Sequence, residues 1–328
     1  MQAITFSNYG SAEVLRLVQA EKPTPTDHQV LVRVHAASAN PLDWHRMRGA
    51  PFIARLSEGL LKPRDTRLGA DIAGRVEAVG SQVTAFHPGD DVFGTCSGSL
   101  AEYACAGEDR LALKPANLSF EAAAAVPVAA FTALQGLRDK AHVRAGQSVL
   151  VNGAAGGVGS FAVQIAKAYG AEVTGVCSTG KLALAYSIGA DHVVDYTQED
   201  FTRSGRQYDV IYDAVGNRSV SDYKRALNPQ GICVVAGFTS LPRLFEHMVL
   251  GPRLSRTGGK QVGLQGMAAT PKNDLLAIKA LLETGKVVPV IDRCYPLREA
   301  AEAIRYLEEG HARGKVIVTA AGADDMAP

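Results

Sequence analysis

The sequence of 328 residues predicts an α/β protein that combines a doubly wound parallel sheet with a partly open β-barrel. Three observations lead to this fold class. A glycine-rich turn joins a short apolar run to a helical pattern within residues 147–170. Strand-like runs then recur every ~20 residues between helical patterns, which is typical of βαβ units. Residues 1–124 instead carry short alternating runs separated by Gly and Pro turns, as barrels do.

The glycine-rich turn is the most specific of these signals. Ser148–Val151 is apolar without polar alternation, as expected of a parallel strand covered on both faces. A helix is expected to open near Val158 and to stop at Gly170. Backbone without Cβ atoms at a helix N-terminus lets an anion approach closely, so the turn predicts a dinucleotide site. The glycines of the turn are Gly153, Gly156, Gly157 and Gly159.

The continuation of the chain supports this interpretation, because a glycine triplet alone is a weak signal. Helical patterns at Lys181–Ile188 and Ser219–Leu227 separate further apolar runs. Right-handed crossovers would place all these runs in one parallel sheet. The further strands are expected at Glu172–Val176, His192–Tyr196, Asp209–Asp213 and Ile232–Ala236.

The end of the second strand of this sheet indicates which dinucleotide is bound. NAD sites usually place Asp or Glu there, whereas this chain continues Cys-Ser-Thr-Gly-Lys through Ser178 and Lys181. Hydroxyl and ammonium groups suit a 2′-phosphate, which a carboxylate would repel. The alternative for Lys181 is a solvated residue in the first turn of a helix, where a cation is slightly unfavourable. The sequence therefore predicts NADPH as the cofactor.

Composition restricts the other partners. The formal net charge is +1, from 34 Lys and Arg against 33 Asp and Glu, and no basic run stands out. Neither nucleic acid nor a membrane is therefore expected as a partner. No secretory signal opens the chain, and Ala122–Leu134 is too short to span a bilayer, so a cytoplasmic location is expected. Five scattered cysteines form no C-x-x-C pair, so no metal site is predicted.

Two segments are expected to build one substrate domain around the nucleotide domain. Residues 1–124 supply its first segment, 125–265 the nucleotide domain, and 266–328 its second segment. Residues 52–67 form a loop without a clear period, which suits a lid or a pocket wall. Strands are expected at Val30–His35, Ile72–Val79, Val92-Phe93 and Lys315–Thr319, and helices at Ala122–Val126 (capped by Ser119), Ala129–Leu137, Lys272–Thr284 and Arg298–Glu309.

Several separated motifs together resemble the medium-chain dehydrogenase/reductase superfamily, specifically its zinc-free, zeta-crystallin-like quinone oxidoreductases. The resemblance covers essentially the whole chain. It implies a Rossmann domain, a GroES-like barrel and a homodimer joined through sheet edges near Ile232–Ala236 and Leu250–Gly266. The motifs are Asn40-Pro41-Leu42-Asp43, Gly69-Ala70-Asp71-Ile72-Ala73-Gly74, Val79-Gly80, Gly89-Asp90, Val126-Pro127, Phe131-Thr132-Ala133, the glycine turn and His311-Ala312-Arg313-Gly314-Lys315.

The same resemblance implies a reaction without zinc. Zinc-dependent relatives carry a cysteine at the place of Asn40 and a histidine at that of Ala70. Without a Lewis acid, hydride from NADPH is better matched to a quinone or an α,β-unsaturated carbonyl, which is already electrophilic. An enoyl-thioester reductase is one alternative, with a basic rim at Arg46, Arg48, Arg55, Lys62, Arg64 and Arg67. A low-turnover NADPH-binding sensor or structural protein is the other.

The resemblance also implies cofactor-binding residues. The backbone at Gly156, Gly157 and Val158 would hold the pyrophosphate. Tyr196 either meets the 2′-phosphate or merely ends a strand, and Lys315 either reaches the cofactor or is a surface lysine. The complete implied set is Gly153, Gly156, Gly157, Val158, Ser178, Lys181, Tyr196, Asn217, Gly237, Phe238 and Lys315.

Three residues are implied in catalysis, each with a structural alternative. Asn40 would donate a hydrogen bond to the substrate oxygen, or cap the turn formed with Pro41. His45 stands where many relatives have a tyrosine, and would donate a proton or simply form a polar wall. Thr132 would orient the nicotinamide, or bond its own helix backbone. Asp43 is expected to support the loop of Asn40.

Overall fold

The computed structural model describes residues 1–52, 55–257 and 259–320, which divide into two compact units. The barrel unit contains Met1–Val128, Thr270–Glu283 and the described residues from Pro289 onward. The sheet unit contains Ala129–Ala269 and Thr284–Val288. The chain thus passes between units after residues 128 and 269, where 124 and 265 were expected, and returns briefly to the sheet unit at 284–288.

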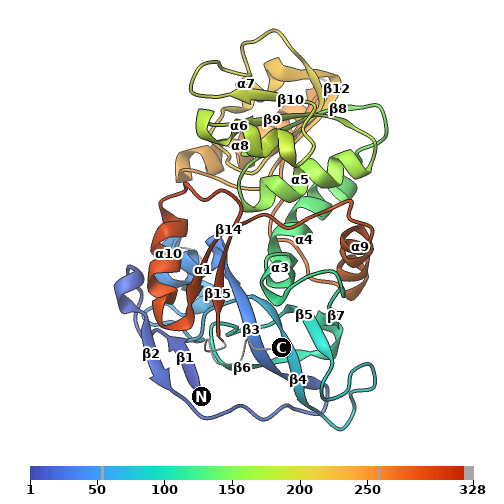
Figure 1. The fold of residues 1–328 in the computed structure, drawn as a ribbon. Helices are drawn as coiled ribbons and strands as arrows, with labels where there is room; N and C mark the ends of the chain where they lie inside the picture. Colours follow the sequence, from blue (N-terminus) through green and yellow to red (C-terminus); the bar gives the residue numbers. More distant parts are fainter. Residues whose placement is uncertain (53–54, 258, 321–328) are drawn as a thin grey trace. The chain divides into compact units, whose positions relative to one another are not determined.

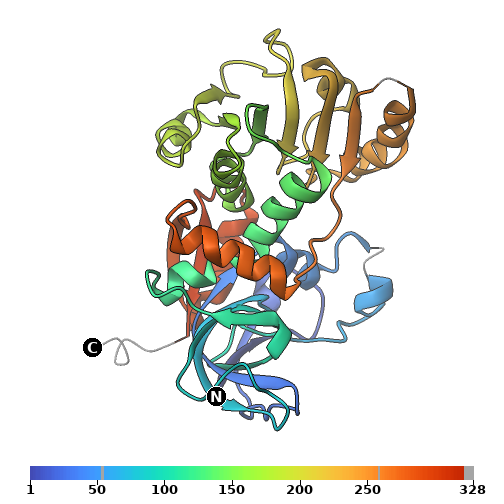
Figure 2. The ribbon, with the colours of Figure 1, turned by 90° about the vertical axis from the view of Figure 1, so that its right-hand side faces the viewer.

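The sheet unit contains a six-stranded sheet in which every neighbouring pair is parallel. Val149, Leu150 and Val151 of its central strand are completely buried, because helices lie on both sides of the sheet (Figure 2). The predicted fold class is confirmed for this unit. The strands in spatial order are β10 (His192–Asp195), β9 (Glu172–Cys177), β8 (Ser148–Asn152), β11 (Tyr208–Asp213), β12 (Leu227–Val235) and β13 (Gln261–Leu264).

Two elements of the sheet unit were not predicted. They are the helix α8 (Leu241–Thr257), which contains Pro252, and the edge strand β13, whose four residues include a glycine. Because β12 pairs with both β11 and β13, the expectation that Ile232–Ala236 forms a sheet edge is wrong. The other helices are α4 (Pro127–Gln135), which leads into the unit, α5 (Gly157–Ala168), α6 (Leu182–Ser187) and α7 (Val220–Ala226).

The barrel unit is built on a seven-stranded, mainly antiparallel sheet. The long strand β3 (Gln29–Ala39) pairs with three others, and its register against β4 (Asp71–Val79) shifts twice, which bends the sheet toward a barrel. The C-terminal strand β15 (Lys315–Thr319) lies beside β3 (Figures 1 and 2). The remaining strands of this sheet are β5 (Asp91–Thr95), β6 (Tyr103–Gly107), β7 (Leu111–Leu113) and β14 (Ile291–Pro296), and a separate two-stranded sheet is formed by β1 (Gln2–Thr5) and β2 (Arg16–Gln19).

The helices of the barrel unit include one where a turn was expected. Asn40 stands in extended conformation at the N-cap of α1 (Pro41–Arg48), and its N–H donates to the Asp43 carboxylate at 2.8 Å. Ser119 caps α3 (Phe120–Ala124), as predicted. No described helix is both long and apolar enough to cross a membrane. The other helices are α2 (Arg55–Glu58), α9 (Lys272–Glu283) and α10 (Ala300–Glu308).

Candidate functional site

The glycine turn of the sheet unit folds tightly against the first turn of α5. Gly153 adopts the left-handed conformation with φ +82°, and its N–H and that of Ala154 both donate to the Val176 carbonyl at 3.0 Å. A Cβ atom on Gly159 would lie only 2.0 Å from the Gly153 carbonyl oxygen. The turn therefore requires glycine at both ends, one for its backbone conformation and the other for close packing.

This turn leaves hydrogen-bond donors available at the N-terminus of α5. The N–H groups of Gly157, Val158 and Gly159 have no acceptor in the described part of the sheet unit, whereas the N–H of Ser160 already bonds the Gly156 carbonyl at 2.9 Å. Three free donors and the positive end of a helix dipole fit a pyrophosphate. The turn therefore fits the predicted dinucleotide.

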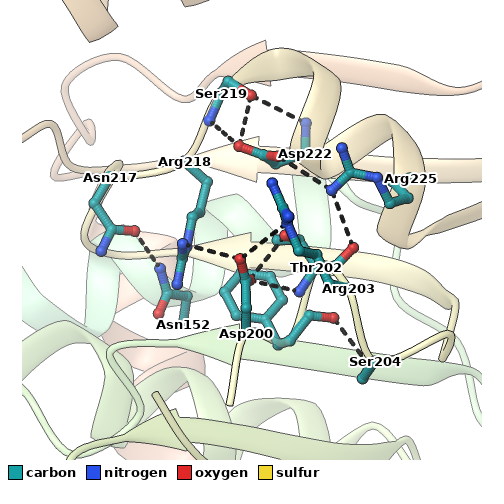
Figure 3. A network of polar contacts seen from close by, with 11 residues as sticks. Asn152, Asp200, Thr202, Arg203, Ser204, Asn217, Arg218, Ser219, Asp222 and Arg225 are labelled. Atoms are coloured by element: carbon teal, nitrogen blue, oxygen red, sulfur yellow. Dashed lines mark hydrogen bonds and ion pairs between the residues drawn. The ribbon is translucent and has the colours of Figure 1, made fainter. Parts of the chain in front are cut away.

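Asp213 organises the neighbouring strand ends and was missed in the sequence. The Asp213 carboxylate is buried and accepts from the N–H groups of Val215 and Gly216, both at 2.7 Å, and from Asn152 at 3.0 Å. The Asn152 amide also donates to Asn217 at 3.2 Å (Figure 3). Asn217, a predicted cofactor residue, is thus fixed beside the end of β8. The signal for Asp213 in the sequence was a carboxylate residue at the end of a predicted apolar strand.

The other cofactor residues expected beyond the later strands lie at the same carboxyl edge. Gly237 follows Ala236, whose N–H donates to the Asp213 carbonyl at 2.8 Å, and Phe238 comes next. The Thr132 carbonyl accepts from Tyr212 at 3.1 Å and from Gln265 at 2.6 Å. The described sheet unit therefore brings together the glycine turn, Asn217, Gly237 and the backbone of Thr132.

Ser178, Lys181 and Tyr196 also belong to this edge, where an acidic side chain joins them. The Tyr196 N–H donates to the Cys177 carbonyl at 3.1 Å, so Tyr196 and Ser178 lie at adjacent strand ends. Asp195 accepts from the Thr179 hydroxyl at 2.5 Å, and this bond lowers its pKa. Asp195 ends the third strand, whereas the sequence pattern of NAD sites concerns a carboxylate after the second strand, so this residue was not predicted.

The barrel unit holds a buried polar cluster of Ser38, Asn40, Asp71 and Lys315, which we call the Asp71 cluster. The Asp71 carboxylate is 0% exposed and accepts from Ser38 at 2.5 Å, from Asn40 at 2.8 Å and from the Val128 N–H at 2.8 Å. Lys315 is 3% exposed, and its ammonium lies 2.7 Å from Asn40 Oδ1 and 3.3 Å from Asp71. The alternative that Lys315 is a surface lysine is therefore wrong.

The Asp71 cluster engages both polar atoms of the Asn40 side chain. Asn40 Oδ1 accepts from Lys315, while Asn40 Nδ2 donates to Asp71 and, at 3.3 Å, to the Ser38 carbonyl. An amide nitrogen has two hydrogens, so neither remains for a substrate oxygen in this arrangement. The geometry supports a positioning role for Asn40 better than direct donation.

Asp43 lies beside this cluster and is also buried. It accepts from the N–H groups of Asn40 at 2.8 Å and Gly69 at 3.0 Å, so it ties α1 to the start of β4. Burial raises the pKa of Asp43 to about 6, although these two N–H groups oppose the shift.

The raised pKa of Asp43 predicts a pH dependence of stability. Between the ordinary value of 3.8 and about 6, the folded state binds a proton more tightly than the unfolded state. This contribution to stability is thus present at low pH and lost as the pH rises through that window, by up to about 3 kcal/mol. We expect urea unfolding followed by Trp44 fluorescence to show this loss in the wild type and not in Asp43→Asn. Parallel pH profiles for the two proteins would contradict it.

His45 lies in α1 with its ring stacked on Trp44, at 3.7 Å between centroids. Burial lowers the pKa of His45, and Nδ1 lies 2.9 Å from the Ala50 carbonyl, which can only accept. In the neutral ring the proton is therefore on Nδ1, and Nε2 carries none. Proton donation from Nε2 would require the imidazolium, whose formation the half-buried position disfavours.

The residues at the zinc position of zinc-dependent relatives do not fit that metal. Asn40 and Ala70 offer no thiolate or imidazole, and the Lys315 ammonium is already bonded to Asn40. No group of three or more His, Cys, Asp and Glu side chains in the described ranges is arranged to hold a metal ion.

Three of the six residues of the basic rim considered for a carrier-bound substrate are paired with carboxylates. Arg46 bonds Glu58 at 3.3 Å, Arg48 pairs with Glu308, and Arg67 bonds Asp65 at 2.9 Å. These pairs reduce the positive field of the segment, so the patch gives little support to an enoyl-thioester substrate held on an acidic carrier.

Comparison with known proteins gives consistent matches along the chain. Residues 26–116 match the model described as alcohol dehydrogenase GroES-like domain, and 188–318 that described as zinc-binding dehydrogenase. The chain is 39% identical to a 2-methylene-furan-3-one reductase of Solanum lycopersicum and 37% to an NADPH-dependent alkenal/one oxidoreductase, chloroplastic, of Arabidopsis thaliana, each over 97% of this chain and 79% of the relative. The structure of a Coxiella burnetii quinone oxidoreductase matches with TM-score 0.85 and 31% identity, over 98% of this chain and 99% of that one.

Proposed function

Because this chain belongs to the medium-chain dehydrogenase/reductase superfamily, among its quinone and alkenal/one oxidoreductases, we propose that it transfers hydride from NADPH to a quinone or an α,β-unsaturated carbonyl compound. The observation that carries this proposal is the glycine turn, whose three free N–H groups suit a pyrophosphate. The relative named as NADPH-dependent, similar over almost the whole chain, supports the choice of cofactor and acceptor.

The carboxyl edge of the sheet unit supplies the residues that would hold NADPH, which when bound provides a hydride donor. Gly156, Gly157 and Val158 would bind the pyrophosphate through their backbone. Ser178, Lys181 and Tyr196 would bind the 2′-phosphate, and Asn217, Gly237 and Phe238 would line the remaining strand ends. Thr132 would face the nicotinamide from a helix whose backbone Tyr212 and Gln265 fix.

The barrel unit would act on the acceptor by positioning rather than by metal catalysis. The Asp71 cluster holds Asn40 and, with it, the N-terminus of α1, which carries His45. Lys315 is therefore engaged with the other residues of the Asp71 cluster, and we propose that its contribution to cofactor binding is indirect. His45 would donate a proton only as the imidazolium, and Asn40 would orient the segment around it. An acceptor that is electrophilic by its own conjugation needs no Lewis acid.

Steady-state oxidation of NADPH tests the proposed function. The panel contains a benzoquinone, a short alkenal, an enone, an enoyl thioester and a saturated aldehyde. We expect turnover of the quinone and of the alkenal or enone, with the saturated aldehyde unreacted. Turnover of the saturated aldehyde alone would refute the proposal, and fast turnover of only the enoyl thioester would favour the carrier-linked alternative.

Lys181→Ala tests the assignment of the 2′-phosphate site. Loss of one charge-assisted hydrogen bond is expected to raise the KM for NADPH about 10- to 100-fold, with little change for NADH. Asp195→Asn is the matched control variant, because it removes a negative charge at the same edge and should not weaken the binding of NADPH. Initial rates with both cofactors give the comparison. Equal increases of both KM values in Lys181→Ala would contradict the assignment.

We also propose a homodimer that uses the outer edge of β13 and the adjacent face of α8. β13 pairs only with β12 among the described strands. Phe245, Met248 and Val249 of α8 are exposed apolar side chains, which are unusual on a monomer surface when they cluster. Phe245→Glu with Val249→Glu should convert a dimer into a monomer in light scattering, whereas Leu17→Glu in β2 should not. A wild-type monomer would refute the proposal.

A further inference from the structure

We infer that a second ligand site, specific for a small monocarboxylate, lies at the amino-terminal edge of the parallel sheet. A pocket of about 280 Å³ is lined there by Ser148, Glu172, His192 and Tyr208, which are the first residues of β8, β9, β10 and β11. The glycine turn follows the last residue of β8, so the cofactor edge is at the opposite end of the strands. This pocket is therefore separate from the site proposed above.

Two buried hydroxyl groups point to a ligand in this pocket. Tyr208 is 3% exposed, and its hydroxyl is buried without a hydrogen-bond partner. Thr174, in β9, is 4% exposed and also lines the pocket. Burial raises the pKa of Tyr208, while Thr174 and Arg206 lower it, so both side chains lie near the phenol oxygen although neither forms a hydrogen bond with it in this geometry. A buried hydroxyl without a partner is costly, and an acceptor atom in the pocket would satisfy it.

The charges around the pocket indicate which kind of hydrogen-bond acceptor the pocket would bind. Arg206 is exposed and forms no ion pair within the described part of the chain, so its guanidinium is available to a planar carboxylate. His192 Nε2 lies 2.8 Å from Glu172, so this ring nitrogen is already paired with a carboxylate. Glu172 and the nearby Asp209, which bonds Ser148, would repel a second negative charge. One free cation, two hydroxyls and two neighbouring carboxylates favour a monoanion over a dianion such as phosphate.

Ligand-observed NMR titrations of the full-length protein with butanoate test this site. Butanamide is the neutral isostere, and inorganic phosphate is the dianion. We expect saturable binding of butanoate at millimolar concentration, with weaker binding of butanamide and phosphate. Arg206→Gln should weaken the binding of butanoate about tenfold or more, and Tyr208→Phe should weaken it about three- to tenfold. Arg144→Gln, an exposed arginine of the same unit outside the pocket, is the matched control and should bind as the wild type does.

Two pocket variants are used so that a folding defect in one of them would not decide the test. Tyr208→Phe removes only a hydroxyl that has no partner, so its melting temperature should not fall below that of the wild type. Butanamide binding as tightly as butanoate would overturn the inference, as would absence of saturable butanoate binding. Unchanged affinity in both Arg206→Gln and Tyr208→Phe would also overturn it. NADPH oxidation is measured alongside and should be unaffected by either variant, since the pocket lies away from the cofactor edge.

Discussion

Gly159→Ala should lower the affinity for NADPH about 100-fold or more. The new Cβ atom would lie 2.0 Å from the Gly153 carbonyl oxygen and 3.0 Å from Ala154 Cα. Neither backbone atom can move without opening the turn, so the free N–H groups of Gly157 and Val158 would no longer converge. Loss of two or more hydrogen bonds to a charged ligand accounts for an effect of this size. Overpacking should also lower the free energy of unfolding by about 1–3 kcal/mol.

Gly263→Ala is the control for this prediction. Gly263 belongs to β13 of the same sheet, and a Cβ atom there would meet nothing within 4 Å. Fluorescence titration of both variants with NADPH makes the comparison. If Gly159→Ala bound NADPH within threefold of the wild type, the glycine turn would not be the pyrophosphate site.

Lys315→Met should lower the free energy of unfolding of the barrel unit by about 3–5 kcal/mol. The substitution leaves the fully buried Asp71 carboxylate without the cation that lies 3.3 Å away. Removing one partner of a buried ion pair is costly because the remaining charge stays desolvated. Trp44, the single tryptophan, lies in α1 of the same unit, so urea unfolding followed by its fluorescence reports on this unit.

A second substitution tests whether charge is the cause. In Lys315→Met with Asp71→Asn no buried charge of the pair remains, and the Asn40 amide can turn to offer its oxygen to the new amide. We expect the double variant to be more stable than the sum of the two single losses predicts, by at least about 1 kcal/mol. Strictly additive losses would show that Lys315 contributes by packing alone.

The sheet unit was predictable because its signals are local in the sequence. An apolar run such as Ser148–Val151 buries both faces wherever it lies in a parallel sheet, and the glycine spacing constrains the backbone directly. The two elements of this unit that were not predicted also have a local explanation in the sequence. β13 has only four residues, and α8 contains both a glycine and Pro252, so neither shows a clear period.

The barrel unit was less predictable because its polar residues depend on distant partners. Asn40 is the N-cap of α1, whereas Asp71 lies in β4 and Lys315 in β15. Only the pairing of β15 and β4 with β3 brings these residues together. The sequence motif placed Lys315 near the cofactor as one possibility and at the surface as the other. No local pattern reveals a contact between residues 71 and 315, so the burial of Lys315 beside Asp71 could not be predicted from the sequence.

Short patterns in the chain were enough to establish the fold class and the glycine turn with its free donors, because backbone conformation and strand burial follow from such patterns. The residues after the second strand indicated NADPH as the expected cofactor. The folded structure was needed to establish that both amide hydrogens of Asn40 are engaged, that Asp195 joins the edge carrying Lys181, and that Tyr208 has an unpaired hydroxyl. Hydrogen bonds and desolvation depend on which strands become neighbours, and that arrangement is a property of the folded chain.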